Sequence, residues 1–289
     1  MVEWPLPLAR AWAADVPEGE KNQMIKLGVN TVLFGKHDFR TAMQHIKWAG
    51  YDAAEISALK GMCEHLCLDT WKKDAADIKA ISQDLELPIT AMEEAALDED
   101  RLMRAYEAGA EIGIPVVNVG PGGSKDNPDD LAKSIDMLAR MAEKAEPFGV
   151  KLCVKAHVGA AIWNTPTTIV AMAKIASPAF GIDMDPSHIH RGGEVPKDAL
   201  RQVISRVKHV HIRDCKGPGP SPGAPEMQAC GRGEIDLMGY CKVLVDAKFD
   251  GPVNLEVIGA GEYELSRCAI IAAESYGYLN ACLKACGGR

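Results

Sequence analysis

The chain of 289 residues contains no apolar run that approaches the ~20 residues of a membrane-spanning helix. Its first ten residues lack the basic segment and apolar core of a secretory signal. Basic residues are also in the minority, because 32 Lys and Arg face 40 Asp and Glu and the formal net charge is −8. A nucleic-acid groove needs a basic face. The sequence therefore predicts a cytoplasmic protein that acts neither on nucleic acid nor at a membrane.

The nine cysteines do not form the even, closely spaced pattern of a disulfide framework. They are scattered along a long chain, which is typical of buried thiols in a reducing compartment. The densest group is Cys63, His65 and Cys67, but no second pair of ligands follows at the spacing of a zinc finger. Ordinary packing is the expectation for this segment.

From residue 25 onward, strand-like and helix-like segments alternate eight times. The expected strands are residues 25–32, 51–56, 88–92, 115–119, 150–154, 180–184, 207–210 and 252–255. Regular alternation of this kind favours a parallel sheet, and about 250 residues suffice for a (β/α)8 barrel. The prediction is a single α/β domain, a TIM barrel over residues 25–289, preceded by a short N-terminal extension of residues 1–24.

Polar residues follow the last four expected strands, each at a carboxyl end. The carboxyl ends of barrel strands meet at one mouth, so these residues are expected to surround one ligand. Polar side chains there are costly unless they hydrogen-bond, pair or bind metal. Asp, His and Glu in such a place predict a divalent-metal site, which a lysine does not fit. The residues are Lys155, His157, Asp185, His188, His211, Arg213 and Glu256.

These motifs resemble the sugar phosphate isomerase/epimerase group of the xylose isomerase-like TIM barrels. The resemblance covers about residues 25–280 and is specific for the superfamily rather than for a substrate. It implies a small sugar or keto-polyol substrate. The matching segments are Gly50-Tyr-Asp-Ala-Ala-Glu55, Asp185-Pro-Ser-His188, Val210-His211-Ile-Arg213-Asp214, Gly231-Arg-Gly-Glu-Ile-Asp236 and Phe249-Asp-Gly-Pro-Val-Asn-Leu-Glu256.

The resemblance also implies a manganese, magnesium or cobalt ion held by Glu, Asp, His and Glu on strands five to eight. The last three positions are Asp185, His211 and Glu256, whereas the first is Lys155. A protonated lysine has three donors and no lone pair, so it cannot ligate a cation. His188, expected in the loop after strand six, and Arg213 match residues that bind substrate.

Three roles for Lys155 remain open. In the first, the metal is retained and another residue supplies the missing ligand: His157, Glu93 or Glu94. In the second, Lys155 is a catalytic base with a pKa lowered by burial or by a nearby cation, or it polarises a carbonyl. In the third, its ammonium stands where the metal would be, paired with Asp185 and Glu256, in a metal-free or inactive relative.

The predicted function is that of a metal-assisted isomerase or epimerase of a small sugar or polyhydroxy keto compound. Proton transfer would pass through an enediolate, with Glu256 as acid and base and Lys155 or His157 at the other face. One alternative is a lyase, dehydratase or keto-glycoside-cleaving enzyme of the same fold. Another is a non-catalytic sugar-binding or partner subunit. A homo-oligomer is expected, with residues 1–24 as one contributor to its interface.

Overall fold

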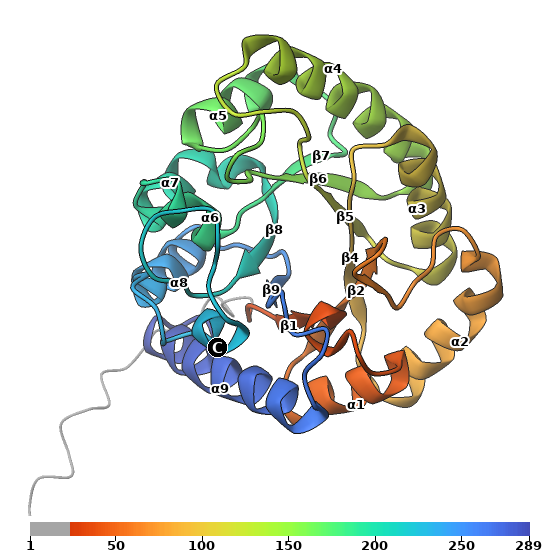
Figure 1. Cartoon of the computed structure of the whole chain (residues 1–289). Coiled ribbons are helices and arrows are strands. Elements are labelled where there is room, and N and C mark those ends of the chain that lie inside the picture. Colours follow the sequence, from red (N-terminus) through yellow and green to blue (C-terminus); the bar gives the residue numbers. More distant parts are fainter. Residues whose placement is uncertain (1–23) are drawn as a thin grey trace, which may run out of the picture.

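The structure is a computed structural model that describes residues 24–289, in which eight parallel strands close into a barrel (Figure 1). Consecutive barrel strands pair with one another, and β1 pairs with both β2 and β9, which closes the sheet. The predicted TIM barrel is therefore confirmed. The barrel strands are β1 (Leu27–Asn30), β2 (Ala53–Leu59), β4 (Ile89–Ala95), β5 (Val116–Val119), β6 (Lys151–Lys155), β7 (Phe180–Asp183), β8 (Val207–Ile212) and β9 (Val253–Leu255).

A ring of helices surrounds the barrel in Figure 1, as the alternating pattern predicts. The helices are α1 (Phe39–Trp48), α2 (Trp71–Asp84), α3 (Glu99–Ile112), α4 (Pro128–Ala145), α5 (Thr165–Lys174), α6 (Pro186–Arg191), α7 (Pro196–Val203), α8 (Leu237–Asp246) and α9 (Leu265–Ala285). Four short 3-10 helices join them: η1 (Thr31–Phe34), η2 (Glu146–Phe148), η3 (Ile204–Arg206) and η4 (Pro225–Gln228). Sequence reasoning missed α6 and the short strand β3 (Cys63–Glu64), which pairs antiparallel with β2.

Helix boundaries follow from local capping chemistry. The side chain of Asn127 accepts hydrogen bonds from the backbone N–H groups of Asp129 and Asp130, and Pro128 occupies the first turn of α4. Helix α3 ends at Gly113, whose φ of 92° is a left-handed conformation that favours glycine. Such signals are local, so they act within a few residues of each helix end.

The two ends of the described chain are tied together beneath the barrel. The backbone N–H of Ile25 donates to the carbonyl of Gly288 at 3.0 Å, and Arg289 donates to the carbonyl of Ile25 at 3.0 Å. Arg289 also pairs with Asp52. Apart from Met24, the predicted extension of residues 1–24 lies outside the described residues, so its contribution to an oligomer remains a prediction.

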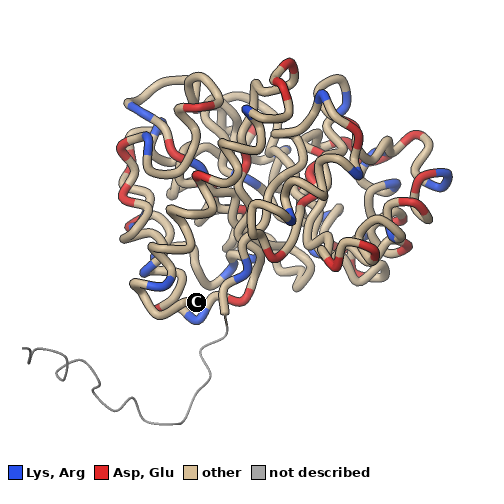
Figure 2. Tube along the Cα trace, turned by 90° about the horizontal axis from the view of Figure 1, so that it is seen from below, with Lys and Arg blue, Asp and Glu red and all other residues tan. Residues whose placement is uncertain are grey.

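Lys and Arg positions (blue) and Asp and Glu positions (red) are interspersed along the described trace in Figure 2. None of the helices within residues 24–289 combines the length and apolar character needed to cross a membrane. All nine cysteines lie within the same range and are free thiols, as predicted. The Sγ of Cys63 lies 3.4 Å from Nδ1 of His65, and neither residue belongs to a group of metal-ligand geometry in the described chain.

Candidate functional site at the barrel mouth

The barrel interior contains a buried polar layer formed by inward-facing residues of β7, β8 and β9. His209 has Nδ1 2.9 Å from Asp183 Oδ1, and its Nε2 accepts a hydrogen bond from Asn254 Nδ2 at 2.8 Å. Asp183 Oδ1 also accepts the backbone N–H of His211. Because parallel strands place these residues side by side, each of these side chains has at least one hydrogen-bond partner, which offsets much of the desolvation cost, although Asn254 Oδ1 has none.

His211 lies in the centre of this layer and is fully buried. Its Nε2 is 2.6 Å from Glu55 Oε2, and its Nδ1 is 2.6 Å from Asp183 Oδ2. The contact of Nε2 with Glu55 is a hydrogen bond, whereas the contact of Nδ1 with Asp183 is an ion-pair contact, and Nδ1 also lies 3.2 Å from the Nζ of Lys155. Burial lowers the pKa of His211, but the carboxylates of Asp183 and Glu55 outweigh it and raise that pKa well above its ordinary value. The two carboxylates therefore favour the imidazolium form of His211.

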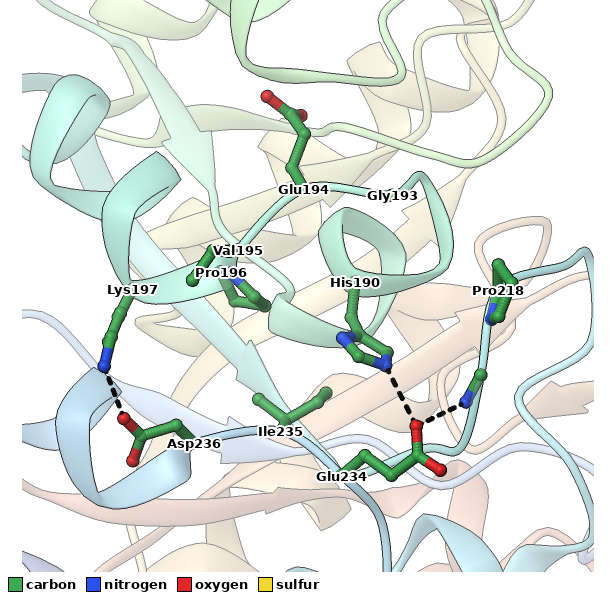
Figure 3. A pocket seen from close by; sticks show the side chains of 11 residues that line it. His190, Gly193, Glu194, Val195, Pro196, Lys197, Pro218, Glu234, Ile235 and Asp236 are labelled. Carbon is green, nitrogen blue, oxygen red and sulfur yellow. Dashed lines mark hydrogen bonds and ion pairs between the residues drawn. The ribbon is translucent and has the colours of Figure 1, made fainter.

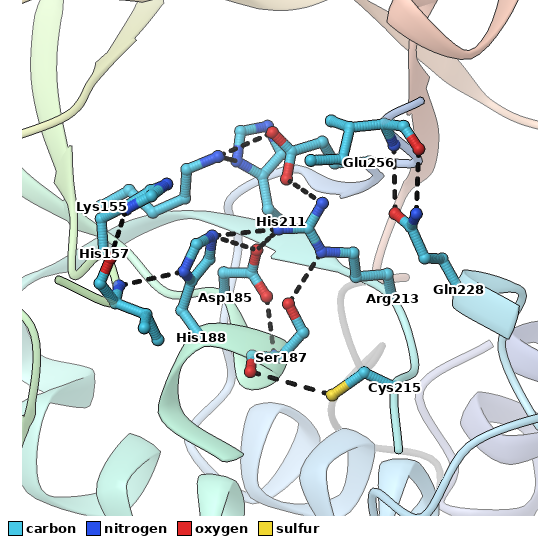
Figure 4. Close-up of polar contacts among 12 residues, drawn as sticks. Lys155, His157, Asp185, Ser187, His188, His211, Arg213, Cys215, Gln228 and Glu256 are labelled. Carbon is cyan, nitrogen blue, oxygen red and sulfur yellow. Dashed lines mark hydrogen bonds and ion pairs between the residues drawn. The ribbon is translucent and has the colours of Figure 1, made fainter. Parts of the chain in front are cut away.

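The ammonium of Lys155 occupies the next layer toward the mouth (Figure 4). Its Nζ lies 2.7 Å from Glu256 Oε1, 2.9 Å from Glu93 Oε1 and 3.2 Å from His211 Nδ1. Burial alone lowers the pKa of Lys155, but Glu256 and Glu93 raise it above its ordinary value. This shift does not favour a base with a lowered pKa, so that role of Lys155 remains a prediction. In the third predicted role, the ammonium would pair with Glu93 and Glu256 rather than with Asp185 and Glu256.

Arg213 connects the two remaining carboxylates of the predicted metal set. Its Nη2 donates to Asp185 Oδ2 at 3.0 Å, and its Nη1 lies 3.0 Å from Glu256 Oε2. The Nε of Arg213 also donates to Ser187 Oγ at 2.7 Å. Burial lowers the pKa of Arg213, but Asp185 and Glu256 raise it overall, so a fixed positive charge bridges both carboxylates.

His188 was expected in a loop, but it lies in the short helix α6. Asp185 caps this helix by accepting the backbone N–H of Ser187 at 2.7 Å, a pattern that Pro186 in the first turn favours. His188 Nε2 lies 3.0 Å from Arg213 Nη2. Burial and then the charge of Arg213 hold the pKa of His188 well below its ordinary value, so this imidazole is neutral.

His157 differs from the other six predicted site residues because it is exposed, whereas they are buried. It follows the end of β6, and its ring centroid lies 4.1 Å from that of His188. Its Nδ1 lies 3.0 Å from the carbonyl of Val158, which can only accept, so Nδ1 carries the hydrogen and Nε2 is left with a lone pair. Burial and then Lys155 lower the pKa of His157, which favours this neutral form.

Glu93 is the fifth carboxylate of the site, and sequence reasoning named it only as a replacement ligand. Its Oε2 accepts a hydrogen bond from Asn30 Nδ2 at 2.6 Å, opposite the contact with Lys155. Burial and then repulsion by Glu256 raise the pKa of Glu93 to about 7, although Lys155 opposes the shift. Asn30 was missed, although a polar residue at the end of the first strand is the available signal. The other suggested ligand, Glu94, pairs instead with Arg101.

Two groups of side chains have donor atoms close enough to share a metal ion. The first, Glu93, His211 and Glu256, already surrounds the Nζ of Lys155. The second is Glu55, His209 and His211, in which Glu55 hydrogen-bonds with His211, and His209 accepts a hydrogen bond from Asn254. Both ring nitrogens of His211 already face partners, Nε2 against Glu55 and Nδ1 against Asp183 and Lys155. The residues in this arrangement therefore do not fit the divalent metal that the resemblance implies.

The predicted metal set of Asp185, His211 and Glu256 does gather at one mouth, but through intervening cations. Lys155 contacts His211 and Glu256, and Arg213 contacts Glu256 and Asp185. The three residues are therefore linked side by side without forming one ligand shell. Their use as metal ligands remains a prediction that this geometry does not favour.

The rim of the mouth is held by Arg191 and Asp214. Arg191 Nη1 donates to the carbonyl of Pro220 at 2.6 Å, which ties the glycine- and proline-rich loop after β8 to α6. The carboxylate of Asp214 accepts the backbone N–H groups of Gly231 and Ile235 at 3.0 and 3.1 Å. It does not pair with Arg213. A Cβ at Gly233 would lie 2.1 Å from Asp214 Oδ1, so this close approach requires glycine.

A pocket of about 480 Å³ lies outside the mouth, between α6, α7 and the segment that leads to α8 (Figure 3). None of the predicted site residues lines it. His190 Nε2 lies 3.8 Å from Glu234, and Lys197 donates to Asp236 at 2.7 Å. These polar side chains of the lining therefore pair within the pocket itself. The pocket is therefore separate from the network of Lys155 and Arg213.

Comparison with curated proteins finds short similarities. A stretch of 113 residues is 26% identical to an inosose dehydratase of Clostridium tetani, covering 39% of this chain and 37% of that protein. A stretch of 140 residues is 26% identical to an inosose dehydratase of Clostridium perfringens, covering 44% of this chain and 46% of that protein. The chain thus spans less than half of the length of the curated relatives it matches.

Solved structures are similar over nearly the whole barrel. A D-tagatose 3-epimerase-like protein superposes with a TM-score of 0.73 at 19% identity, over 91% of this chain and 98% of that chain. The IOLI protein, solved with a zinc atom, superposes with a TM-score of 0.73 at 19% identity, over 89% of this chain and 99% of that chain. The family model described as xylose isomerase-like TIM barrel matches residues 26–274. The chain belongs to the xylose isomerase-like TIM barrel family.

Proposed function

We propose that the chain is an enzyme that removes the proton next to the carbonyl group of a small polyhydroxy ketone and then expels water. The observation that carries this proposal is the exposed imidazole of His157, which lies against His188 beside the buried cations Lys155 and Arg213. A neutral imidazole is a competent general base near pH 7, and a fixed positive charge stabilises an enolate oxygen.

Elimination of water needs only one general base. His157 Nε2 takes the proton from the carbon next to the carbonyl, and the C–H electron pair forms the new double bond. The carbon–oxygen bond on the neighbouring carbon then breaks, and the imidazolium returns its proton to the departing hydroxyl group, so that water leaves. No oxidant or reductant is required.

Isomerisation or epimerisation, the reaction favoured by the sequence, shares the first proton transfer but needs the proton returned to another carbon or to the other face. The expected second base, Glu256, is held between Lys155 and Arg213. Burial raises the pKa of Glu256, but these cations lower it well below its ordinary value. Glu256 is therefore a weak base, which favours elimination as the outcome.

The similarity to inosose dehydratases and to a D-tagatose 3-epimerase-like protein supports a polyhydroxy ketone as the substrate class. The purified chain is incubated in D2O with inosose, 3-dehydroshikimate, D-fructose or D-tagatose. Mass spectrometry then follows loss of water, and NMR follows deuterium at the carbon next to the carbonyl. Loss of water from one of these compounds is the expected result.

Two histidine variants separate the site from the rest of the fold. His157→Gln should reduce turnover by about 100-fold or more, the usual contribution of a general base. His190→Gln changes a histidine beside the separate pocket and should leave turnover unchanged. Deuterium uptake without loss of water assigns an isomerase or epimerase instead. Sugar binding without either reaction assigns a non-catalytic sugar-binding protein.

A further inference from the structure

We infer that the ammonium of Lys155, together with the guanidinium of Arg213, replaces a divalent cation at this barrel mouth. The native chain then binds no divalent metal there. This inference concerns the charge that occupies the site and holds for any reaction that the mouth catalyses.

The position of Lys155 is the first argument. Its Nζ lies 2.7, 2.9 and 3.2 Å from atoms of Glu256, Glu93 and His211, the same three residues whose donor atoms are spaced to share an ion. A divalent ion bonds such atoms at ~2.0–2.6 Å. The ion and the ammonium would therefore occupy the same space, so only one of them can be present.

The number of charges is the second argument. Glu256 has one oxygen 2.7 Å from Lys155 and the other 3.0 Å from Arg213. Arg213 extends the array to Asp185, which the metal-bearing arrangement would place on the ion. Two single positive charges thus stand among the carboxylates in place of one double charge.

His211 is also already engaged. Its Nε2 lies 2.6 Å from Glu55 Oε2, and its Nδ1 lies 2.6 Å from Asp183 Oδ2 and 3.2 Å from the Nζ of Lys155. An ion would have to displace one of these partners to reach a nitrogen of His211.

The test compares Mn²⁺ binding by the chelator-treated native chain, Lys155→Glu, Lys155→Met and the control Lys60→Glu. Lys60 forms an exposed ion pair with Asp69. Free Mn²⁺ is measured by electron paramagnetic resonance, and thermal unfolding is followed with and without Mn²⁺. The native chain and Lys60→Glu are expected to show no site and no shift in Tm. Lys155→Glu is expected to bind one ion per chain, at least about tenfold more tightly than the native chain.

Lys155→Met keeps the measurement decisive if the additional carboxylate prevents folding, because it removes the ammonium without adding charge. It should bind Mn²⁺ more weakly than Lys155→Glu but more tightly than the native chain. One tightly bound Mn²⁺ per native chain overturns the inference, as does the absence of any gain in either folded variant. If neither variant folds, the native chain's own Mn²⁺ titration decides. These readouts do not use turnover, so a failed substrate panel leaves them intact.

Discussion

Replacing Arg213 by methionine tests whether the buried charge array supports the barrel mouth. The guanidinium is 1% exposed and contacts both Asp185 and Glu256. Methionine fills similar space but removes the positive charge, which leaves both carboxylates buried with less compensation. Removing one partner of a buried ion pair costs about 3–5 kcal/mol.

A loss of this size corresponds to a decrease in Tm of about 6–20 °C, at ~2–4 °C for each kcal/mol. The matched control is Arg232→Met. Arg232 forms two hydrogen bonds of 2.6 Å with Glu274, but its side chain is 42% exposed. An exposed pair contributes only about 0–1 kcal/mol, so the control should unfold nearly as the native chain does.

The pH dependence gives a second readout, measured by urea unfolding of both variants. In the native chain Glu256 has a pKa well below its ordinary value of 4.5, because Arg213 and then Lys155 outweigh the effect of burial. That stabilisation is present above about pH 4.5 and is lost as the pH falls through the folded pKa. Without Arg213 the folded pKa rises, so the deficit of Arg213→Met should be full at pH 7 and should shrink as the pH falls below about 4.5, where the variant's carboxyl group takes up a proton and the native carboxylate keeps its charge. Equal losses in both variants, or a deficit independent of pH, would refute the reasoning.

Two further predictions concern Glu93 and Asp214. Because burial and Glu256 raise the pKa of Glu93 to about 7, the folded chain keeps a proton that the unfolded chain releases above about pH 4.5. Stability should therefore fall between about pH 4.5 and pH 7, and Glu93→Gln should flatten this slope in urea unfolding, whereas an unchanged slope would contradict the assignment. Asp214→Asn leaves one side-chain acceptor oxygen for the backbone N–H groups of Gly231 and Ile235 and should cost about 1–3 kcal/mol, with faster proteolysis of residues 216–235. Proteolysis at the native rate would argue against this role of Asp214.

The barrel could be predicted because its signals are local. Alternating apolar segments, the cap at Asn127 and the glycine at Gly113 each act within a few residues, so they place strands and helices directly in the sequence. The carboxyl ends of the strands then had to meet at one mouth. His211 and Glu256 lie together there as expected, and helix α6 was missed because six residues carry too little periodicity.

The partners of the buried charges depend on the tertiary structure. Lys155 meets Glu93 from 62 positions away and Glu256 from 101 positions away, and no local pattern records which carboxylate its long side chain reaches. His211 is held between two carboxylates because strands β2 and β7 place Glu55 and Asp183 on either side of it. Sequence alone determined the barrel and the positions of its polar residues. Only the packed interior, where every charge must be compensated, decided that cations stand among the expected metal ligands.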